Sequence, residues 1–470
     1  MVMLIRFNVK NFLSFNARED NRSEEFSMLA GKVRNKKEHV IEQGNLRLLK
    51  FAALYGANAA GKSNFVKALN FMRTTLVTHL PEGHTERYCK LDAANKQKPS
   101  YFELELLLNG QCYAYGFEVI LSQSKFISEW LIELQPNGND KVIFIRDIEN
   151  KSYQLSSALK ADKKLASRMQ VYIEDICADS SVLFLRTLNT NKKTLYKDYP
   201  NVQFFQDIYQ WILKKLEISN PGQAISSYSS YLQAADGTKD VQEICCQLSA
   251  LGIGITDFQM VEIALEQVLK DIPNTPRRLI EKELEETKAK LLREDKVDKL
   301  SKVQFIMRSK KDFFVLRFDQ EGNIRCQTIE FKHGKQGGFF RLDEESDGTV
   351  RILDLLEILL AKEDKTYVID ELDRCLHPSL TYRFIETFFQ IAKTRNVQLI
   401  VTTHESRLLD FDLLRRDEVW FVDKAANGQS SIYSLEEYNT RFDQKIDKAY
   451  LEGRYGGVPI FNTLFPITEE

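Results

Sequence analysis

A loop of small residues near the N-terminus has the composition of a phosphate-binding site. Residues 56–63, Gly-Ala-Asn-Ala-Ala-Gly-Lys-Ser, fit the pattern G-x-x-x-x-G-K-[ST] between a strand-like and a helix-like run. Phosphates need backbone N–H donors that approach closely, and they gain from the positive end of a helix dipole. We expect Lys62 to reach the β- and γ-phosphates and Ser63 to bind Mg²⁺. The sequence therefore predicts an ATP site formed by Gly56, Ala57, Asn58, Ala59, Ala60, Gly61, Lys62, Ser63 and Asn64.

Two adjacent acids follow an apolar run further along the chain. Residues 366–369, Thr-Tyr-Val-Ile, lead directly into Asp370 and Glu371. At the carboxyl end of a buried strand, Asp370 fits the residue that holds Mg²⁺, and Glu371 fits the general base that polarises the attacking water. Alone, such a pair is often only a strand end. Behind a phosphate loop, we interpret it as metal-binding and catalytic.

A histidine follows the next apolar strand. Residues 397–402 lead into Thr403 and His404. An imidazole at this place can hydrogen-bond the γ-phosphate and sense its presence, whereas an isolated histidine is more often a satisfied core residue. Its place one strand after the acids favours a catalytic role for His404 beside Glu371.

A short polar run opens a helix-like segment between the phosphate loop and the acids. In residues 345–349, Glu-Ser-Asp-Gly-Thr, a serine and a glycine precede a helix expected from Val350. Such a start can bind an anion, although it is also an ordinary helix cap. Its position in the order of motifs leads us to add Ser346, Asp347, Gly348 and Thr349 to the ATP site.

The elements that must position these residues differ along the chain. The first part is strand-rich, and alternating runs on both sides of Asn109-Gly110 predict a hairpin. The middle has mostly helical spacing. The last part has strands at 303–307, 313–318 and 324–331, and then helices alternating with the strands 366–369 and 397–402. This alternation predicts a parallel α/β layer.

We therefore expect an α/β fold with three regions. Residues 1–150 would form the first ATPase lobe, with an antiparallel N-terminal β lobe and the phosphate loop of a parallel sheet. Residues 151–300 would form a helical insertion. Residues 301–470 would form the second ATPase lobe, with the serine-glycine helix start, the acid pair and the histidine.

The composition excludes several classes of protein. The chain has 470 residues and a net charge of -2, which excludes a uniformly basic nucleic-acid coat. No apolar run approaches the roughly 18 residues that a membrane span needs. The 7 cysteines form no Cys-x-x-Cys, and neither they nor the histidines have metal-ligand spacing. We expect a cytoplasmic protein with reduced thiols, without a membrane anchor or a structural zinc site.

The order of these motifs resembles that of ABC-type ATPase heads, in particular the SMC and RecF group. Residues 7–15, FNVKNFLSF, look like the first strand and turn of that group. Residues 370–378, DELDRCLHP, are similar to a run in OLD-like ATPases of bacterial anti-phage loci. The ending at 450–459, YLEGRYGGVP, resembles the tail of abortive-infection AbiL-type ATPases.

The resemblance implies a head-to-tail homodimer or higher oligomer that uses ATP and Mg²⁺. ATP would lie between the phosphate loop of one subunit and Ser346–Thr349 of the other. Two positions depart from the family pattern. Ala59 replaces a glycine, which is tolerable if its φ is negative. Asp347 replaces a glycine and puts an acid near a phosphate.

Three functions remain open. The first is an ATPase that controls a partner effector encoded nearby, in anti-phage abortive infection. The aromatic residues at 204, 205, 209 and 211 would then be either core or a docking surface. The second is a RecF-like ATPase of DNA repair or end recognition, with basic pairs such as Lys36-Lys37, Lys163-Lys164 and Arg415-Arg416 on the phosphate backbone. The third, a non-hydrolysing scaffold, is disfavoured by Glu371.

Overall fold

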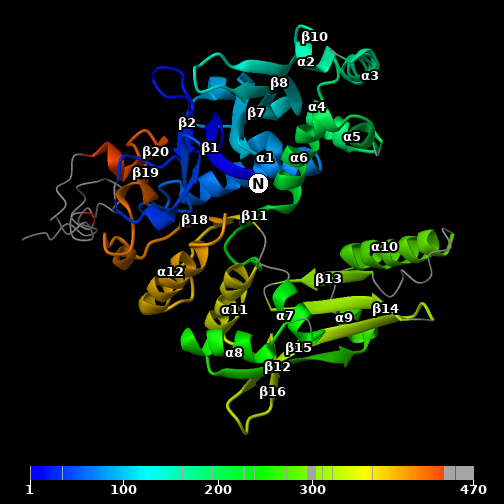
Figure 1. Ribbon diagram of the computed structural model, residues 1–470, viewed down its shortest axis with the longest axis vertical. Helices are drawn as coiled ribbons and strands as arrows, with labels where there is room; N and C mark the ends of the chain where they lie inside the picture. The colour runs from blue at the N-terminus through cyan, green and yellow to red at the C-terminus, as the bar shows by residue number, and fades with distance from the viewer. Residues whose placement is uncertain are drawn as a thin grey trace, which may run out of the picture. The chain divides into compact units, whose positions relative to one another are not determined.

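The computed structural model divides the chain into two compact units (Figure 1). The first comprises Met1–Pro221, Glu363–Arg374 and Ile385–Glu470, and the second comprises Gly222–Lys362 and Cys375–Phe384. The structure describes residues 2–33, 35–160, 162–192, 194–225, 228–237, 239–270, 274–293, 303–309, 311–319, 321–361, 364–438 and 450.

A mainly parallel sheet in the first unit carries the predicted ATP-binding loop. Its strands are β5 (Phe51–Tyr55), β11 (Leu216–Ser219), β17 (Thr366–Ile369), β18 (Gln398–Thr402), β19 (Val419–Lys424) and β20 (Ser430–Ser434). Their order is β11-β17-β18-β5-β19-β20, with only the β19–β20 pair antiparallel. Every residue of β5, β17 and β18 is buried, as in a parallel sheet with both faces covered.

The parallel arrangement brings separate motifs to one edge. The carboxyl ends of β5, β17, β18 and β19 lie on the same side of the sheet because these strands run in the same direction. The loops that follow them start at residues 56, 370, 403 and 425. Ligands of open α/β sheets bind at this edge, so the fold places the predicted site residues where such a site is expected.

An antiparallel sheet forms the second layer of the first unit. Its strands are β1 (Val2–Lys10), β2 (Glu24–Ser27), β6 (Ser100–Leu108), β7 (Gln111–Ile120), β8 (Lys125–Leu134), β9 (Lys141–Asp147) and β10 (Ser152–Leu155), in the order β10-β9-β8-β7-β6-β1-β2. The predicted hairpin is confirmed: Asn109 and Gly110 have φ of 49° and 88°, as a primed turn requires. A small hairpin, β3 (Val40–Gln43) and β4 (Leu46–Leu49), accompanies this sheet.

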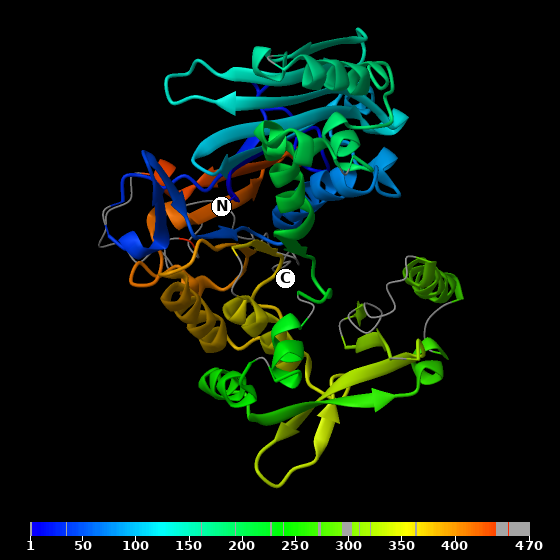
Figure 2. The ribbon, with the colours of Figure 1, turned by 45° about the vertical axis from the view of Figure 1, so that its right-hand side comes forward.

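Helices of the first unit pack on these sheets (Figure 1, Figure 2). They are α1 (Lys62–Val77), α2 (Ser157–Lys160), α3 (Lys163–Glu174), α4 (Phe184–Asn189), α5 (Leu195–Asp198) and α6 (Gln203–Lys214). Helix α6 contacts α1, α4, β1 and β6. Its residues Phe205 and Trp211 are only 0% and 1% exposed and belong to the main hydrophobic core, so the aromatic cluster is core packing.

The second unit is built on another antiparallel sheet. Its strands are β12 (Ile255–Ile263), β13 (Gln304–Arg308), β14 (Phe313–Phe318), β15 (Ile324–His333) and β16 (Phe339–Arg341), with the order β12-β15-β14-β13 and β16 paired to β15. Helices α7 (Ser229–Ala235), α8 (Val241–Ala250), α9 (Leu265–Lys270), α10 (Asn274–Arg293) and α11 (Asp347–Leu360) belong to it. Helix α12 (Pro378–Ala392) follows β17 in the chain.

The observed division of the chain differs from the expected regions 1–150, 151–300 and 301–470. Residues 151–300 are not one helical insertion, because β11 pairs in parallel with β17 and β12 belongs to the sheet of the second unit. A four-residue strand such as Leu216–Ser219 is too short for its periodicity to be separated from the end of a helix. Among the described helices, none combines the length and apolarity that a membrane span requires.

The tail motif predicted at 450–459 lies outside the described residues except for its first member. Tyr450 is 6% exposed, and its ring lies 5.7 Å from the rings of both Tyr55 and Phe421. This tyrosine therefore packs at the end of β5, directly before the phosphate-binding loop.

Candidate functional site

The phosphate-binding loop, residues 56–61, joins β5 to α1 as predicted, and both of its glycines are required sterically. A Cβ on Gly56 would lie 2.3 Å from the carbonyl oxygen of Val422 in β19. Gly61 has a φ of 122° and leaves room for Ser430, whose Oγ would lie 2.4 Å from an added Cβ. The loop is thus closely packed against β19 and β20, which the sequence alone did not reveal.

Ala59 is an exception within the loop. Its φ is 63°, in the left-handed region, so the condition under which an alanine is tolerated here without strain, a negative φ, is not met. A side chain in this region is strained by contact between Cβ and the backbone. The family glycine would be the relaxed choice, and Ala59 therefore holds local strain within the predicted phosphate-binding loop.

Lys62 is buried and points back at its own loop. Its Nζ donates to the carbonyl oxygens of Gly56 at 2.7 Å and Ala57 at 3.1 Å. Burial lowers the pKa of Lys62 to about 8, although the nearby carboxylates of Asp370, Asp373 and Glu371 oppose this shift. In the free protein, the Lys62 ammonium is hydrogen-bonded to carbonyl oxygens and not to an anion. Bound phosphates would give it an anionic partner.

Two serines distant in sequence brace the loop from outside. The Asn64 side-chain amide donates to Ser14 Oγ at 2.8 Å, and Ser14 Oγ lies 2.7 Å from Ser430 Oγ. The Ser430 hydroxyl also donates to the carbonyl of Ala60 at 2.5 Å. Ser14 belongs to the FNVKNFLSF run and Ser430 begins β20. The run that resembles the SMC and RecF group therefore supports the phosphate-binding loop directly.

The acid pair lies at the end of β17 as predicted. Asp370 is 1% exposed, and its Oδ1 accepts a hydrogen bond of 2.5 Å from Thr402 Oγ1. Thr402 Oγ1 in turn accepts the backbone N–H of Glu371 at 2.8 Å, which ties the two strand ends together. Glu371 has a φ of 53°, a left-handed backbone conformation that strains a residue with a side chain.

His404 lies beside the acids, after β18. Its backbone N–H donates to Asp373 Oδ1 at 3.3 Å. Desolvation and the Lys62 ammonium lower the pKa of His404, against the opposing effect of Asp373, Glu371 and Asp370. The ring is therefore neutral at pH 7 and offers one N–H donor and one acceptor.

Many of these residues line one cavity of about 380 Å³ in the first unit, whereas Gly56, Ala57 and Asp370 of the predicted site are outside its lining. It is formed by residues 58–64, Lys67, Glu371, His404 and Lys424. The chemistry fits MgATP: the loop is made of small residues with an ammonium, and the hydroxyl of Ser63 and the carboxylate of Asp370 are oxygen ligands of the kind that Mg²⁺ prefers. Sequence reasoning missed Lys67 and Lys424, although Lys67 stands four residues after Ser63 and so shares its face of α1.

The predicted serine-glycine helix start lies in the second unit. Ser346 is the N-cap of α11, and its Oγ accepts the backbone N–H of Thr349 at 3.1 Å. The helix thus begins at Asp347 rather than at Val350. A Cβ on Gly348 would lie 3.0 Å from the carbonyl oxygen of Cys375, so the chain passes closely there. The Asp347 carboxylate pairs with Lys311 at 3.2 Å, which offsets its charge.

The rest of α11 contains buried charged residues. Asp354 and Glu357 are 3% and 5% exposed, and burial raises the pKa of each. Arg308 from β13 pairs with Asp354 at 3.0 Å, and the backbone N–H of Ser230 donates to Glu357 at 2.8 Å. These contacts attach the helix to β13 and α7 within the second unit. The apolar spacing of the helix gave no sign of them.

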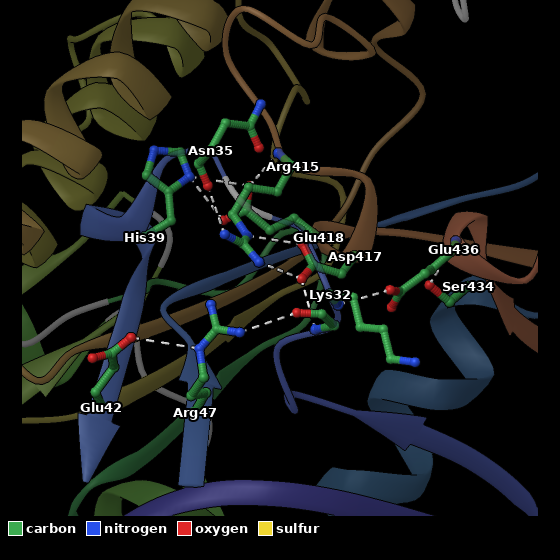
Figure 3. Close-up of polar contacts among 11 residues, drawn as sticks. Lys32, Asn35, His39, Glu42, Arg47, Arg415, Asp417, Glu418, Ser434 and Glu436 are labelled. Atoms are coloured by element: carbon green, nitrogen blue, oxygen red, sulfur yellow. Dashed lines mark hydrogen bonds and ion pairs between the residues drawn. The ribbon is translucent and has the colours of Figure 1, made fainter. Parts of the chain in front are cut away.

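A second group of charges in the first unit is fully enclosed (Figure 3). We call it the buried charge cluster, formed by His39, Arg415, Asp417 and Glu418. Arg415 donates two hydrogen bonds to Asp417, at 2.9 and 2.6 Å, and His39 Nδ1 lies 2.9 Å from Glu418 Oε1. Burial lowers the pKa of His39 to about 3 and raises that of Glu418. Gly31 and Asn35 complete the cluster through their backbone, as N–H donor to Asp417 and carbonyl acceptor from Arg415.

The profile of the family described as "AAA domain, putative AbiEii toxin, Type IV TA system" matches residues 51–217 and 260–410. No curated protein matches the chain.

Several solved structures are similar at low identity. An SMC head bound to the C-terminal winged-helix domain of ScpA is 13% identical, with 92% of this chain and 99% of that chain covered and a TM-score of 0.39. The SMC head domain from Thermotoga maritima is 13% identical, with 92% and 98% covered and a TM-score of 0.34. An SMC head with an extended coiled coil, bound to the C-terminal domain of ScpA derived from Pyrococcus furiosus, is 13% identical, with 97% and 100% covered and a TM-score of 0.35.

Proposed function

Because the chain belongs to the AAA-domain family of the AbiEii type, we propose that it is an ATPase whose nucleotide cycle controls a partner effector in bacterial anti-phage defence. The observation that carries this proposal is the single cavity lined by the phosphate-binding loop, Glu371 and His404. A phosphate cradle and a carboxylate base in one cavity are parts that hydrolysis of a nucleoside triphosphate uses. The neutral imidazole beside them adds a hydrogen-bond donor for the γ-phosphate.

The residues divide the chemistry between them. The loop N–H groups and the Lys62 ammonium bind the phosphates and offset their charge. Ser63 and Asp370 would hold Mg²⁺, which offsets charge on the phosphates when it is bound. The Glu371 carboxylate takes a proton from the attacking water. The neutral His404 ring donates a hydrogen bond to the γ-phosphate.

Two substitutions test ATP hydrolysis. Lys62→Ala removes the ammonium from the phosphate site, so MgATP binding measured by calorimetry should fall by about 100-fold or more. Glu371→Gln keeps the shape of the base but cannot accept a proton, so binding should persist while turnover falls by about 10²–10⁴-fold. MgATP affinity that is unchanged in Lys62→Ala would show that the loop is not the nucleotide site.

We propose further that two subunits complete each site, with Ser346 to Thr349 of one subunit facing the phosphates bound by the other. Support comes from Ser346, which caps α11 and is exposed, and from Asp347, whose charge is offset by Lys311. Ser346→Arg should leave MgATP binding near normal and remove hydrolysis. A mixture of Ser346→Arg and Lys62→Ala should recover activity, because a mixed dimer contains one intact composite site. Full activity of Ser346→Arg alone would contradict the arrangement.

A partner effector is proposed because an ATP-driven switch needs a target. Among the described residues, no group of three or more histidines, cysteines and acids is placed to bind a metal, so a metal-dependent nuclease centre has no support there. The proposal predicts that a protein encoded beside this one copurifies with the full chain. Its release or activation should depend on ATP and be blocked in Glu371→Gln.

Some of the basic residues that suggested a RecF-like DNA-binding ATPase are not available to contact DNA. Arg415 is 1% exposed and pairs with Asp417, and Lys36 donates to the carbonyl oxygen of Phe411. The side chains of Arg415 and Lys36 therefore make internal contacts in place of contacts with DNA. Lys163 and Lys164 remain exposed at the start of α3. Stimulation of turnover by duplex DNA would favour this alternative.

A further inference from the structure

Two lysines outside the nucleotide motifs line the phosphate cavity. Lys67 and Lys424 come from different elements, α1 and the end of β19. Both are exposed, and neither has an ion pair or side-chain hydrogen bond with any described residue. Elsewhere in the described chain, lysines such as Lys311 and Lys365 pair with a nearby acid, Asp347 and Glu217 respectively. Two unpaired ammonium groups at one cavity therefore indicate an anionic ligand.

The position of Lys67 is set by α1. The helix begins at Lys62, and Lys67 stands one turn beyond Ser63 on the same face. Both Ser63 and Lys67 line the cavity, so this face of α1 is turned toward it. The lysine can therefore extend the phosphate-binding surface of the loop along the helix.

The position of Lys424 is set by strand pairing. Phe421 pairs with Tyr55 at the end of β5, and Lys424 pairs with Ser430 across the β19–β20 hairpin. Ser430 is bonded to the carbonyl of Ala60 inside the loop. Consequently, the backbone that carries Lys424 is attached to the phosphate-binding loop by a hydrogen bond as well as by the sheet.

The side chains that line the cavity carry more positive than negative charge, while the carboxylates of Asp370 and Asp373, which also act on Lys62, lie outside this lining. Lys62, Lys67 and Lys424 contribute positive charge, Glu371 contributes negative charge, and His404 is neutral at pH 7. A triphosphate brings more negative charge than one ammonium and one Mg²⁺ offset. The additional lysines supply the remainder.

We propose that Lys67 and Lys424 bind the phosphates of the nucleotide together with Lys62, so that recognition of the triphosphate extends over α1 and the β19–β20 hairpin. This inference rests on the proposed ATPase function. It assigns the two lysines to the nucleotide and not to the backbone of a nucleic acid.

The test measures binding to the full-length protein by calorimetry with two probes, MgATP and inorganic tripolyphosphate. Lys67→Gln and Lys424→Gln should each lower the affinity for both probes by roughly tenfold, because each substitution removes a charged hydrogen bond to the phosphates. Lys67→Arg and Lys424→Arg should retain most of the affinity. Lys164→Gln, which removes an exposed charge outside the cavity, is the matched control and should change neither probe.

Each outcome has a defined meaning. MgATP and tripolyphosphate affinities within twofold of the unmodified protein in both Gln variants would overturn the inference. Loss of MgATP binding with tripolyphosphate binding retained would overturn it as well, because the lysines would then contact the ribose or base. Binding of a duplex oligonucleotide is measured on the same variants, and its loss without loss of MgATP binding would overturn the inference by assigning the lysines to a nucleic acid. If the unmodified protein binds no MgATP, the proposed function fails before this inference is reached.

Discussion

Two groups of charged side chains in the first unit contain similar residue types but differ in how far their charges are paired within the protein. The phosphate cavity and the buried charge cluster both contain at least one cation, at least one acid and a histidine. In the buried charge cluster, the cation is Arg415, and it pairs with Asp417. In the phosphate cavity, Lys67 and Lys424 have no described partner, and Lys62 is bonded only to carbonyl oxygens.

This difference in pairing distinguishes charged side chains that stabilise the fold from charged side chains that are available to bind a ligand. Arg415 is paired and buried, so its interactions favour the folded chain and leave nothing for a ligand. Lys67 and Lys424 of the phosphate cavity would gain partners when an anion binds. The same contrast appears in the histidines, since His39 is bonded to Glu418 while His404 lines the cavity.

The largest predicted effect concerns the stability of the buried charge cluster. Glu418→Ala leaves His39 and the backbone N–H of Arg415 without their acceptor, so unfolding should become easier by roughly 3 kcal/mol. Glu418→Gln is the matched control. Because burial raises the pKa of Glu418, an uncharged amide should cost less than about 1 kcal/mol. Urea unfolding measures both, and equal losses would mean that Glu418 acts as a charge.

A smaller effect is expected for the brace of the phosphate-binding loop. Ser430→Ala removes the hydrogen bonds to Ser14 and to the Ala60 carbonyl, so MgATP affinity should fall about fivefold. The melting temperature without nucleotide should change little. Ser431→Ala, at the next position of β20, is the control and should bind normally. An equal loss of MgATP affinity in both variants would contradict a specific role for Ser430.

Strain in the same loop predicts a gain of stability. Ala59→Gly relieves the left-handed backbone and should stabilise the protein by about 1 kcal/mol. Ala57→Gly, at a position without positive φ, should instead be neutral or destabilising. Thermal unfolding of both variants checks this difference, and destabilisation by Ala59→Gly would contradict it.

The smallest predicted effect is linked to protonation of Lys62. Its pKa of about 8 in the free protein lies below the ordinary 10.5, so the free lysine loses its proton as pH rises through 8. Bound phosphates favour the charged form, and nucleotide binding above pH 8 should therefore take up protons. At pH 8.5, deprotonation of Lys62 in the free protein should lower the affinity for MgATP about fourfold. Calorimetry in buffers of different ionisation enthalpy measures the uptake, which should be absent in Lys62→Arg.

The local motifs could be predicted from the sequence because each depends on residue type at fixed spacing. Residues 56–63 need small side chains and a lysine at a strand-to-helix turn, and residues 366–371 need an apolar strand that ends in acids. Both elements are observed where they were expected. The hairpin at Asn109-Gly110 follows from the same local rule.

Contacts between distant segments could not be predicted, because periodicity carries no information about which strands become neighbours. Only the order β18-β5-β19 brings Ser430 and Lys424 to a loop that lies more than 300 residues earlier in the chain. The burial of Arg415 beside Asp417, the left-handed φ of Ala59 and the place of residues 216–219 in the parallel sheet were decided in the same way. The sequence by itself determined which chemistry is present, and the tertiary structure decided which charges are paired internally and which remain available to a ligand.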